Sequence, residues 1–370
     1  MLFEVKKFLK SRRNIIAIIF LIVSIIFFAG NSNRIDKQIN KSKIANMDIQ
    51  IEELGREVRI LKQENNIYEA DTLNEIVQVL KKQKDSINRK DNVEYIKSKI
   101  EYNEFKIELS DSKYFNNINI DKVLEENEEY EKLIELNIEP IEKEYSMEGY
   151  NFLRLILNAP MTLIFSLIIF IFICNSVSGE SENRTYKILL TQPISKVKII
   201  IGKFIGLFAI STTVIIINIG IAFITLSAIN GFGNSNYPVK ILLGGEETFI
   251  TIKEFVSHGI IFLIIYILFL CIFSTFISVI SNQVSTSISI CTIISLSMYL
   301  INFKFRVGGL LAKYLPFSLL ETSLVYSGQL AIIYSNKDYS IEGSIISSFI
   351  IIFILTISTI TLFNNKSNYS

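Results

Sequence analysis

Residues 255–280 read FVSHGIIFLIIYILFLCIFSTFISVI, and this stretch decides the fold class. It contains no Asp, Glu, Lys or Arg, and Ile, Leu and Phe dominate it. The hydrocarbon core of a bilayer is about 30 Å thick, which roughly 20 apolar residues of helix can cross. Lipid offers no partners to backbone polar groups, so a single chain segment crosses it as an α-helix. The stretch therefore predicts a transmembrane helix.

Five further segments have a similar length and composition. The six predicted spans are Asn14–Gly30, Phe152–Cys174, Ile200–Ile229, Phe255–Ile280, Val284–Ile301 and Gly343–Phe363. Their only charged residues are Arg154 and Lys203, each near the end of a span, from where a long side chain can reach the headgroups. We expect an all-α integral membrane protein with six transmembrane helices.

The first span follows a basic N-terminal flank that resembles the start of a signal peptide. Its apolar run is long for such a peptide, and Phe27 and Phe28 stand where cleavage would need small residues. We expect an uncleaved anchor within residues 1–30. The residues before it carry Leu2, Val5 and Leu9 at helical spacing, so they form either an interfacial helix or a simple basic flank.

Charge is concentrated between the first two spans. Residues 31–150 hold 27 of the 36 acidic and 19 of the 37 basic residues. Apolar residues follow a helical seam through Ile51, Leu54, Val58 and Leu61. We expect residues 31–151 to form a large helical or coiled-coil extracytoplasmic domain, and we interpret most of its charges as solvated surface.

Basic residues set the predicted orientation, because cytoplasmic loops are enriched in Lys and Arg. The first thirteen residues carry five Lys or Arg and one Glu, and the loop 175–203 is also basic. Both should lie in the cytoplasm, which places residues 31–151 outside and the C-terminus inside. The composition, rich in Ile, Asn and Lys without Trp, is typical of an AT-rich bacterial genome, so we expect a multi-pass protein of a bacterial plasma membrane.

Residues 310–334 are apolar enough to suggest a seventh span. Pro316, Glu321, Ser327 and Gln329 interrupt the run. This pattern favours outer re-entrant helices at about 305–335 over a seventh crossing, provided that they pack against protein. In this interpretation residues 152–370 form a five-span domain.

The loop after the second span, at residues 179–206, reads GESENRTYKILLTQPISKVKIIIGKFIG. Glu180 and Glu182 precede an apolar run that Pro193 ends, which predicts a short amphipathic helix at about 180–193 with acids at its N-terminal end. Ser195 would then cap the next span. An ordinary cytoplasmic loop would explain the charges, but not an amphipathic helix between two spans.

These residues resemble the loop between the second and third spans in permeases of the ABC type 2 exporter family. That loop has a glutamate-rich turn, a Gly-Thr pair, a short apolar run, a Pro-[Ile/Val]-Ser-[Lys/Arg] step and a Gly-Lys pair, which is Gly202-Lys203 here; Arg184 replaces the glycine of the Gly-Thr pair. The resemblance covers residues 1–30 and 152–363. It implies that the loop is a coupling helix that docks into a cytoplasmic ATPase. The implied coupling residues are Glu180, Glu182, Arg184, Thr185, Tyr186, Lys187, Leu189, Leu190, Pro193, Ile194 and Ser195.

Several classes of function find no support in the sequence. No Gly-x-x-x-x-Gly-Lys-[Ser/Thr] motif is present to hold nucleotide phosphates, so ATP hydrolysis is expected on a partner chain. The three cysteines lack metal-ligand spacing and His258 is the only histidine, so we expect no metal, cofactor or catalytic residues. A net charge of +1 gives no reason to expect a nucleic acid partner.

We therefore expect a permease subunit of an ABC exporter in the lipid bilayer, paired as a homodimer or with a similar permease subunit. A cytoplasmic ABC ATPase subunit would drive it. The alternative is a membrane-anchored sensor or scaffold whose outer coiled coil recognises a ligand. Polar residues in the spans, such as Asn218, Ser274 and Thr292, either line a substrate path or bond to the backbone of their own helices.

Overall fold

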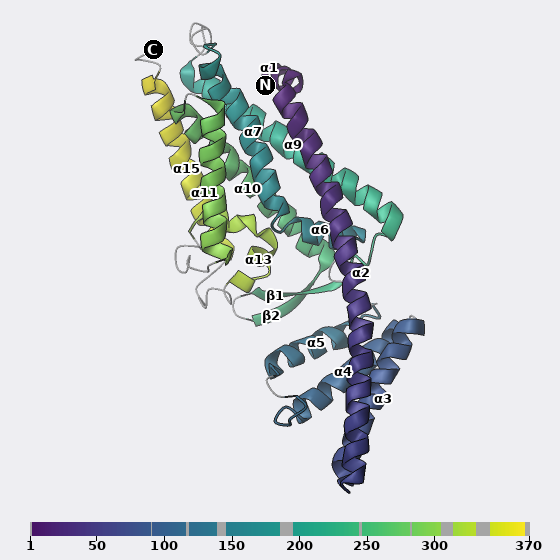
Figure 1. The fold of residues 1–370 in the computed structure, drawn as a ribbon. Coiled ribbons are helices and arrows are strands. Elements are labelled where there is room, and N and C mark those ends of the chain that lie inside the picture. The colour runs from purple at the N-terminus through teal and green to yellow at the C-terminus, as the bar shows by residue number, and fades with distance from the viewer. Residues whose placement is uncertain are drawn as a thin grey trace. The chain divides into compact units, whose positions relative to one another are not determined.

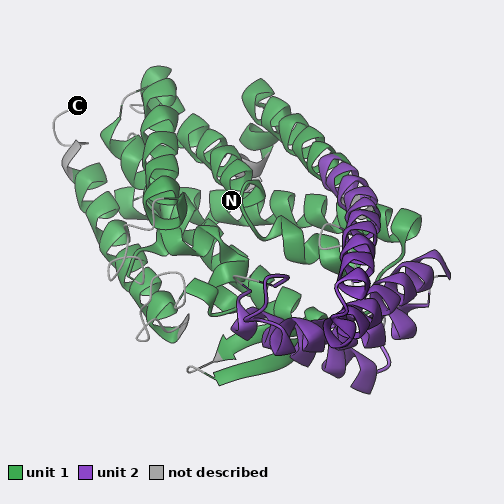
Figure 2. Ribbon diagram, turned by 60° about the horizontal axis from the view of Figure 1, so that its bottom comes forward, with its two compact units in different colours: residues 1–30, 147–235, 239–370 green, residues 31–146, 236–238 purple. Residues whose placement is uncertain are grey.

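The computed structural model describes residues 2–89, 91–115, 118–138, 146–185, 195–243, 246–281, 283–304, 314–330 and 341–366. The chain forms two compact units (Figure 2). The first contains residues 1–30, 147–235 and 239–370, and the second contains residues 31–146 and 236–238.

Six helices among the described residues are long and apolar enough to cross a membrane, in agreement with the six predicted spans. They are α2 (Arg12–Gln63), α7 (Met161–Glu182), α9 (Lys196–Asn230), α10 (Ile252–Ile280), α11 (Val284–Tyr299), which a π-helix (Leu300–Lys304) continues, and α15 (Ile341–Lys366). Shorter elements of the first unit are α1 (Leu2–Lys10) and α6 (Gly149–Ile156).

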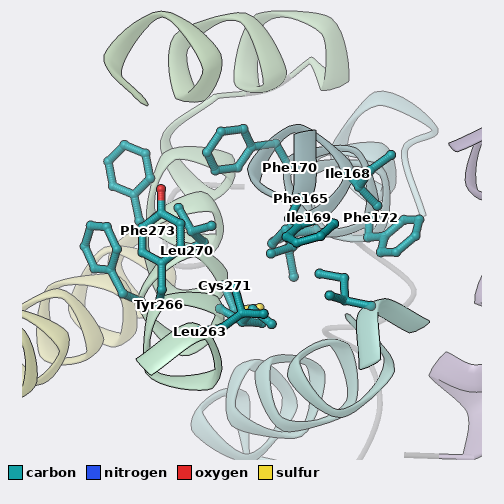
Figure 3. Packing of buried hydrophobic residues seen from close by; sticks show 14 of the residues in the cluster. Phe165, Ile168, Ile169, Phe170, Phe172, Leu263, Tyr266, Leu270, Cys271 and Phe273 are labelled. Atoms are coloured by element: carbon teal, nitrogen blue, oxygen red, sulfur yellow. The ribbon is translucent and has the colours of Figure 1, made fainter. Parts of the chain in front are cut away.

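Helices α7 and α10 form the centre of the first unit. In their most apolar stretches 72% and 61% of the residues are buried, against 17% to 22% in the other four candidate spans. Helix α10 packs against α7, α9, α11 and α15 (Figure 1). Figure 3 shows the aromatic and aliphatic side chains that α7 and α10 contribute to this core. The hydroxyls of Ser166 and Tyr266 lie 3.1 Å apart and join the two helices inside it.

The second predicted span, Phe152–Cys174, is divided in the structure. Helix α6 ends at Ile156, and α7 begins at Met161 after Pro160, which has no backbone N–H to donate. The carboxylate of Glu321 accepts the backbone N–H of Ala159 at 3.0 Å in this interruption. At its other end α7 runs eight residues beyond Cys174, to Glu182.

The first predicted span, Asn14–Gly30, is part of a longer helix. Helix α2 is 52 residues long and continues through Gly30 to Gln63. A glycine inside a helix costs only about 1 kcal/mol relative to alanine, and residues 31–63 contain no proline, so nothing in the sequence stops the helix there. Hydropathy located the span but not the end of the helix.

The expectation of an all-α fold misses one feature, a two-stranded sheet. Strands β1 (Pro238–Leu243) and β2 (Glu246–Thr251) pair within the loop predicted at 230–254. β-Branched residues such as Val239, Ile241 and Ile250 favour strands, and two glycines stand between the runs in the sequence, which is a hairpin signal. Thr251 and Glu254 then form a capping box that starts α10.

Of residues 310–334, which could form a seventh span or re-entrant helices, the structure describes residues 314–330. They contain a 3₁₀-helix, η2 (Pro316–Leu320), and α13 (Thr322–Tyr326). Five residues of helix extend only about 10 Å at most, so neither element can cross a bilayer. Residues Pro316–Leu320 are all buried, and η2 packs against α10 and α15. The described part fits short helices packed against protein, and residues 305–313 and 331–335 lie outside the described residues.

The second unit is helical. Besides the later part of α2, it contains α3 (Ile67–Arg89), α4 (Asn92–Glu108) and α5 (Ile120–Glu135). Seam residues Val58 and Leu61 of α2 are buried together with Leu73 and Ile76 of α3 and Tyr102 of α4, so more than two helices share one core. The break before α4 was not predicted; the side chain of its N-cap residue Asp91 accepts the N–H of Glu94 at 3.1 Å.

We predict that Gly149→Ala destabilises the first unit. A Cβ at Gly149 would lie 2.8 Å from Cε2 of Phe223 on α9 and would also clash with Ser227. Overpacking of this kind costs about 1–3 kcal/mol. The measurement is the thermal unfolding midpoint of the full chain in a neutral detergent.

Gly220→Ala, on α9, is the matched control, because a Cβ at Gly220 meets nothing within 4 Å. It should leave the midpoint unchanged or raise it, since alanine favours helix by about 1 kcal/mol over glycine. Equal midpoints for both variants would contradict the close packing of α6 on α9.

Candidate functional site

The end of α7 holds a buried carboxylate between two ammonium groups. Oε1 of Glu180 lies 2.6 Å from Nζ of Lys7 on α1 and 2.6 Å from Nζ of Lys203 on α9. The side chains of Glu180 and Lys203 are 8% and 5% exposed, and that of Lys7 is 35% exposed. Charges buried to this extent are stable only when they are paired. Glu180 therefore links three helices electrostatically.

The N-terminal residues have further contacts with α7. The side-chain amide of Asn175 donates to Oγ of Ser11, between α1 and α2, at 2.8 Å and to Oδ1 of Asn14 on α2 at 3.1 Å. The rings of Phe8 and Phe172 meet edge to face with centroids 4.7 Å apart. Helix α1 also packs against α9. The N-terminal segment is thus a packed part of the bundle, and its predicted place on the membrane surface stays a prediction.

The same end of α7 is bonded to the start of α11. Oε2 of Glu182 accepts the backbone N–H of Val284 at 2.8 Å, at the helix N-terminus, where the dipole favours a carboxylate. One turn earlier, the hydroxyls of Ser178 and Ser287 lie 2.6 Å apart in a buried position. Two adjacent turns of α7 therefore fix its register against α11.

A tight turn follows Glu182. Arg184 adopts φ 57°, in the left-handed region that glycine enters easily and other residues seldom do. The backbone N–H of Thr185 donates to the carbonyl of Glu180 at 3.0 Å and closes the turn. Arg184 is the position where the exporter family usually has glycine, and the sharp turn forms here without it.

The predicted helix at 180–193 needs a correction at its start. Glu180 and Glu182 do not open a new helix; they lie in the last turn of α7. The dipole at a helix C-terminus opposes a carboxylate, so Lys7 and Lys203 compensate Glu180, while the N-terminus of α11 holds Glu182. The helix runs past Cys174 because Asn175, Ser178 and Glu180 have polar partners on other helices.

The structure describes five of the eleven predicted coupling residues. Glu180, Glu182, Arg184 and Thr185 lie together at the end of α7, and Ser195 occupies the N-cap position of α9. Among the described residues around it, Ser195 makes no side-chain capping bond. The predicted residues outside the described ones are Tyr186, Lys187, Leu189, Leu190, Pro193 and Ile194.

Sequence reasoning missed several partners of this site. Lys7 was counted only as a basic flank, and the pairing of Lys203 with Glu180 was not predicted. Asn175, Ser178 and Glu180 follow the apolar run without an intervening proline, so the sequence allows the helix to continue past Cys174. The three residues do not share one side of the helix, so they form no polar stripe from which the distant partners could be read.

The three polar residues of the spans that were named as examples bond to the backbone of their own helices. Asn218, Ser274 and Thr292 bond to the carbonyls of Val214, Leu270 and Ile288 within their own helices. His258 approaches the carbonyl of Glu254 at 2.8 Å and stacks on Tyr326. In each of these bonds the partner is a backbone carbonyl, so they pair none of the polar residues named here with a second side chain that could act with it in catalysis.

We predict that Glu180→Gln destabilises the chain strongly, because it leaves Lys203 buried without its carboxylate. Breaking a buried ion pair in this way costs about 3–5 kcal/mol. Lys203→Gln should cost nearly as much, and Lys7→Gln about 1 kcal/mol or less, because Lys7 is more exposed. Thermal unfolding of the purified variants in detergent tests this order.

Glu342→Gln, an exposed position on α15, is the control and should change stability by no more than about 0.5 kcal/mol. If Glu180→Gln unfolds at the same temperature as the control, the ion cluster does not hold α1, α7 and α9 together.

In a comparison with protein families, the chain matches the family described as ABC-2 family transporter protein over residues 2–367. The match also runs through residues 31–151, beyond the two ranges on which the sequence resemblance rested. A comparison with curated proteins finds no match. Since the family match covers nearly the whole chain, this protein belongs to the ABC-2 transporter family, as a multi-pass membrane permease subunit rather than an enzyme.

Proposed function

We propose that this chain is the permease of an ABC exporter and that the segment beginning at Glu180 couples it to a cytoplasmic ATPase. ATP hydrolysed by the partner would move a substrate out of the cell through the helices of this chain. The observation that carries the proposal is the ion cluster of Glu180, Lys7 and Lys203 at the base of the 179–206 loop. A coupling segment needs a rigid base, and this one is bonded to three other helices.

The bonds around α7 supply a path for coupling. A partner that displaces residues 186–194 pulls on the turn at Asn183–Thr185, and that turn continues directly into Glu182 and Glu180. Glu182 bonds α11, and Glu180 bonds α1 and α9. Because α7 and α10 form the packed centre, a shift of α7 reaches the core of the bundle. Packed interfaces of this kind change between discrete arrangements rather than deform continuously.

We also propose an orientation of the chain in the membrane. Both termini and the 179–206 loop would lie in the cytoplasm of a bacterial cell, and residues 31–151 would lie outside, as a helical or coiled-coil domain. In helices α2, α9, α11 and α15 only 17% to 22% of the most apolar stretch is buried, and each of these helices carries exposed large apolar side chains, which suits lipid and a second permease subunit. We propose a homodimer or a pair with a similar permease.

We predict that Tyr186→Ala/Leu190→Ala weakens docking of the ATPase. Aromatic and aliphatic anchors at interface hot spots contribute about 2 kcal/mol or more each, so losing even one weakens binding roughly thirtyfold. The measurement is the amount of cognate ATPase that co-purifies with the chain. Glu182→Lys tests the base of the segment, since it would place a positive charge at the N-terminus of α11.

Tyr68→Ala is the matched control, because Tyr68 is 86% exposed on α3 and should lie on the far side of the membrane. The control should keep the ATPase at wild-type stoichiometry. If the double variant also keeps it and supports normal transport, residues 186–190 are not the coupling element.

We predict that a cysteine replacing Asn31 or Tyr68 reacts with an impermeant thiol reagent on intact cells, and that one replacing Ser195 reacts only after permeabilisation. All three positions are exposed. The three native cysteines are buried, so the wild-type chain serves as the blank.

A cysteine at position 337 decides the re-entrant interpretation and should be labelled from outside. Labelling of position 337 only from the cytoplasm would make residues 310–334 a seventh span. Labelling of Ser195→Cys on intact cells would reverse the orientation.

A further inference from the structure

A buried carboxyl side chain between η2 and α13 has no part in the site described above. Glu321 is only 8% exposed, and η2, which precedes it, packs against α10, α11 and α15. Its Oε2 accepts the backbone N–H of Ala159 at 3.0 Å, in the break between α6 and α7. This hydrogen bond ties the short helices η2 and α13 to the interruption of the second predicted span.

Glu321 has no cation that compensates its charge among the described residues. The bond to Ala159 is the one hydrogen bond of its side chain there, and it forms no ion pair. The described cations of neighbouring elements lie elsewhere: Arg154 is bonded within α6, and Lys253 and Lys304 are exposed. Glu180, which is buried to a similar extent, has two ammonium groups at 2.6 Å. The two buried carboxyl groups are therefore treated differently by the fold.

Other titratable groups around Glu321 supply no positive charge either. The charge of Glu321 acts on the phenol of Tyr299 on α11. On α10, His258 stacks on Tyr326 of α13, and Glu254 caps its own helix. No charge on the other described titratable residues of α6, α10, α11 and α15 acts on Glu321; these are Tyr150, Tyr266, Cys271, Cys291 and Glu342.

A proton fits this position better than a metal ion. No group of three or more His, Cys, Asp or Glu side chains that could hold a metal occurs in the part of the chain that the structure describes. Oδ1 of Asn158, the residue before Ala159, is buried and has no hydrogen-bond partner in that part of the chain. A buried acceptor without a donor is unfavourable, and an un-ionised carboxyl group adds one O–H donor. A proton would thus remove a buried charge and supply a donor.

We propose that Glu321 is a proton-binding site, which holds a proton while η2 and α13 pack against the break between α6 and α7. Water does not reach the buried group to stabilise its ionised form, so the neutral acid is favoured. When the contact opens, the O–H bond breaks, its electron pair stays on the carboxyl oxygen, and the proton passes to water.

Opening of this segment is thereby linked to the release of one proton. In the orientation proposed above the proton leaves on the outer side of the membrane. That side rests on the proposed function, whereas the proton site itself does not.

The test compares the full wild-type chain with Glu321→Gln in neutral detergent, between about pH 4 and about pH 8. Glutamine is neutral at every pH and has nearly the shape of protonated glutamic acid. An exposed glutamate has a pKa of about 4.3, so above this pH the unfolded wild-type chain loses a proton that the folded chain keeps. The folding constant of the wild type relative to Glu321→Gln should then fall about tenfold per pH unit, until the folded chain ionises as well. Thermal unfolding midpoints measure this change.

Infrared difference spectroscopy gives a readout that a merely structural role would not change. At neutral pH the spectrum of the wild type minus that of Glu321→Gln should contain the C=O stretch of an un-ionised carboxylic acid. Glu246→Gln, at an exposed position on β2, is the matched control. It should show no such band, and its unfolding midpoint should follow that of the wild type at every pH.

The proposal is overturned if the midpoints of the wild type and Glu321→Gln differ by the same amount at every pH, or if the band is absent. Failure of Glu321→Gln to fold at neutral pH also overturns it, because a neutral residue of this shape should be tolerated. Replacing sodium by choline at constant pH separates a metal ion from a proton. If the difference follows sodium rather than pH, the ligand is a metal ion and the proposal is wrong.

Discussion

The arrangement of one end of the helix bundle depends on the burial of a single carboxylate. Glu180 and Lys203 are almost inaccessible to solvent, and each partner of Glu180 comes from a different helix. Removing α9 from α7 would leave Glu180 and Lys203 buried with less compensation, which costs far more than the loss of an exposed ion pair. Helices α7 and α9 are therefore held together strongly, and the more exposed Lys7 adds a weaker link to α1. This property suits the coupling role proposed above for the segment that follows α7.

The same end of α7 combines two kinds of contact with different consequences. Ion pairs with α1 and α9 fix which helices are neighbours, and the bonds of Ser178 and Glu182 to α11 fix how far the helices can slide. With apolar packing alone, a helix could exchange its neighbours or slide along them at a small cost, because lipid is as apolar as the side chains that it replaces. Polar contacts thus give the packing of α7 its specificity.

The sequence predicts the spans well because hydropathy is a local property, and it predicts their ends poorly because the ends depend on distant partners. Helix α7 passes Cys174 through bonds to residues more than 160 positions away, such as Asn175 to Ser11 and Lys7 to Glu180. The hairpin of β1 and β2 was missed although β-branched residues and two glycines marked it. In the second unit, Asp91 was a readable N-cap signal that apolar periodicity alone overlooked.

The sequence motif drew attention to Glu180 and Glu182, but we predicted them at the start of a new helix, whereas they lie in the last turn of α7. The reason for this error is general. Acidic residues between two helices can belong to the start of the second or the end of the first, and the helix dipole favours only the former. Carboxylates at the end of a helix therefore require cations or a neighbouring helix N-terminus, and here Lys7, Lys203 and Val284 provide them. Lys203 had been explained by the membrane interface alone. A lysine eight residues into α9 is far from the helix end, where snorkelling is easy, so its position already indicated a buried partner.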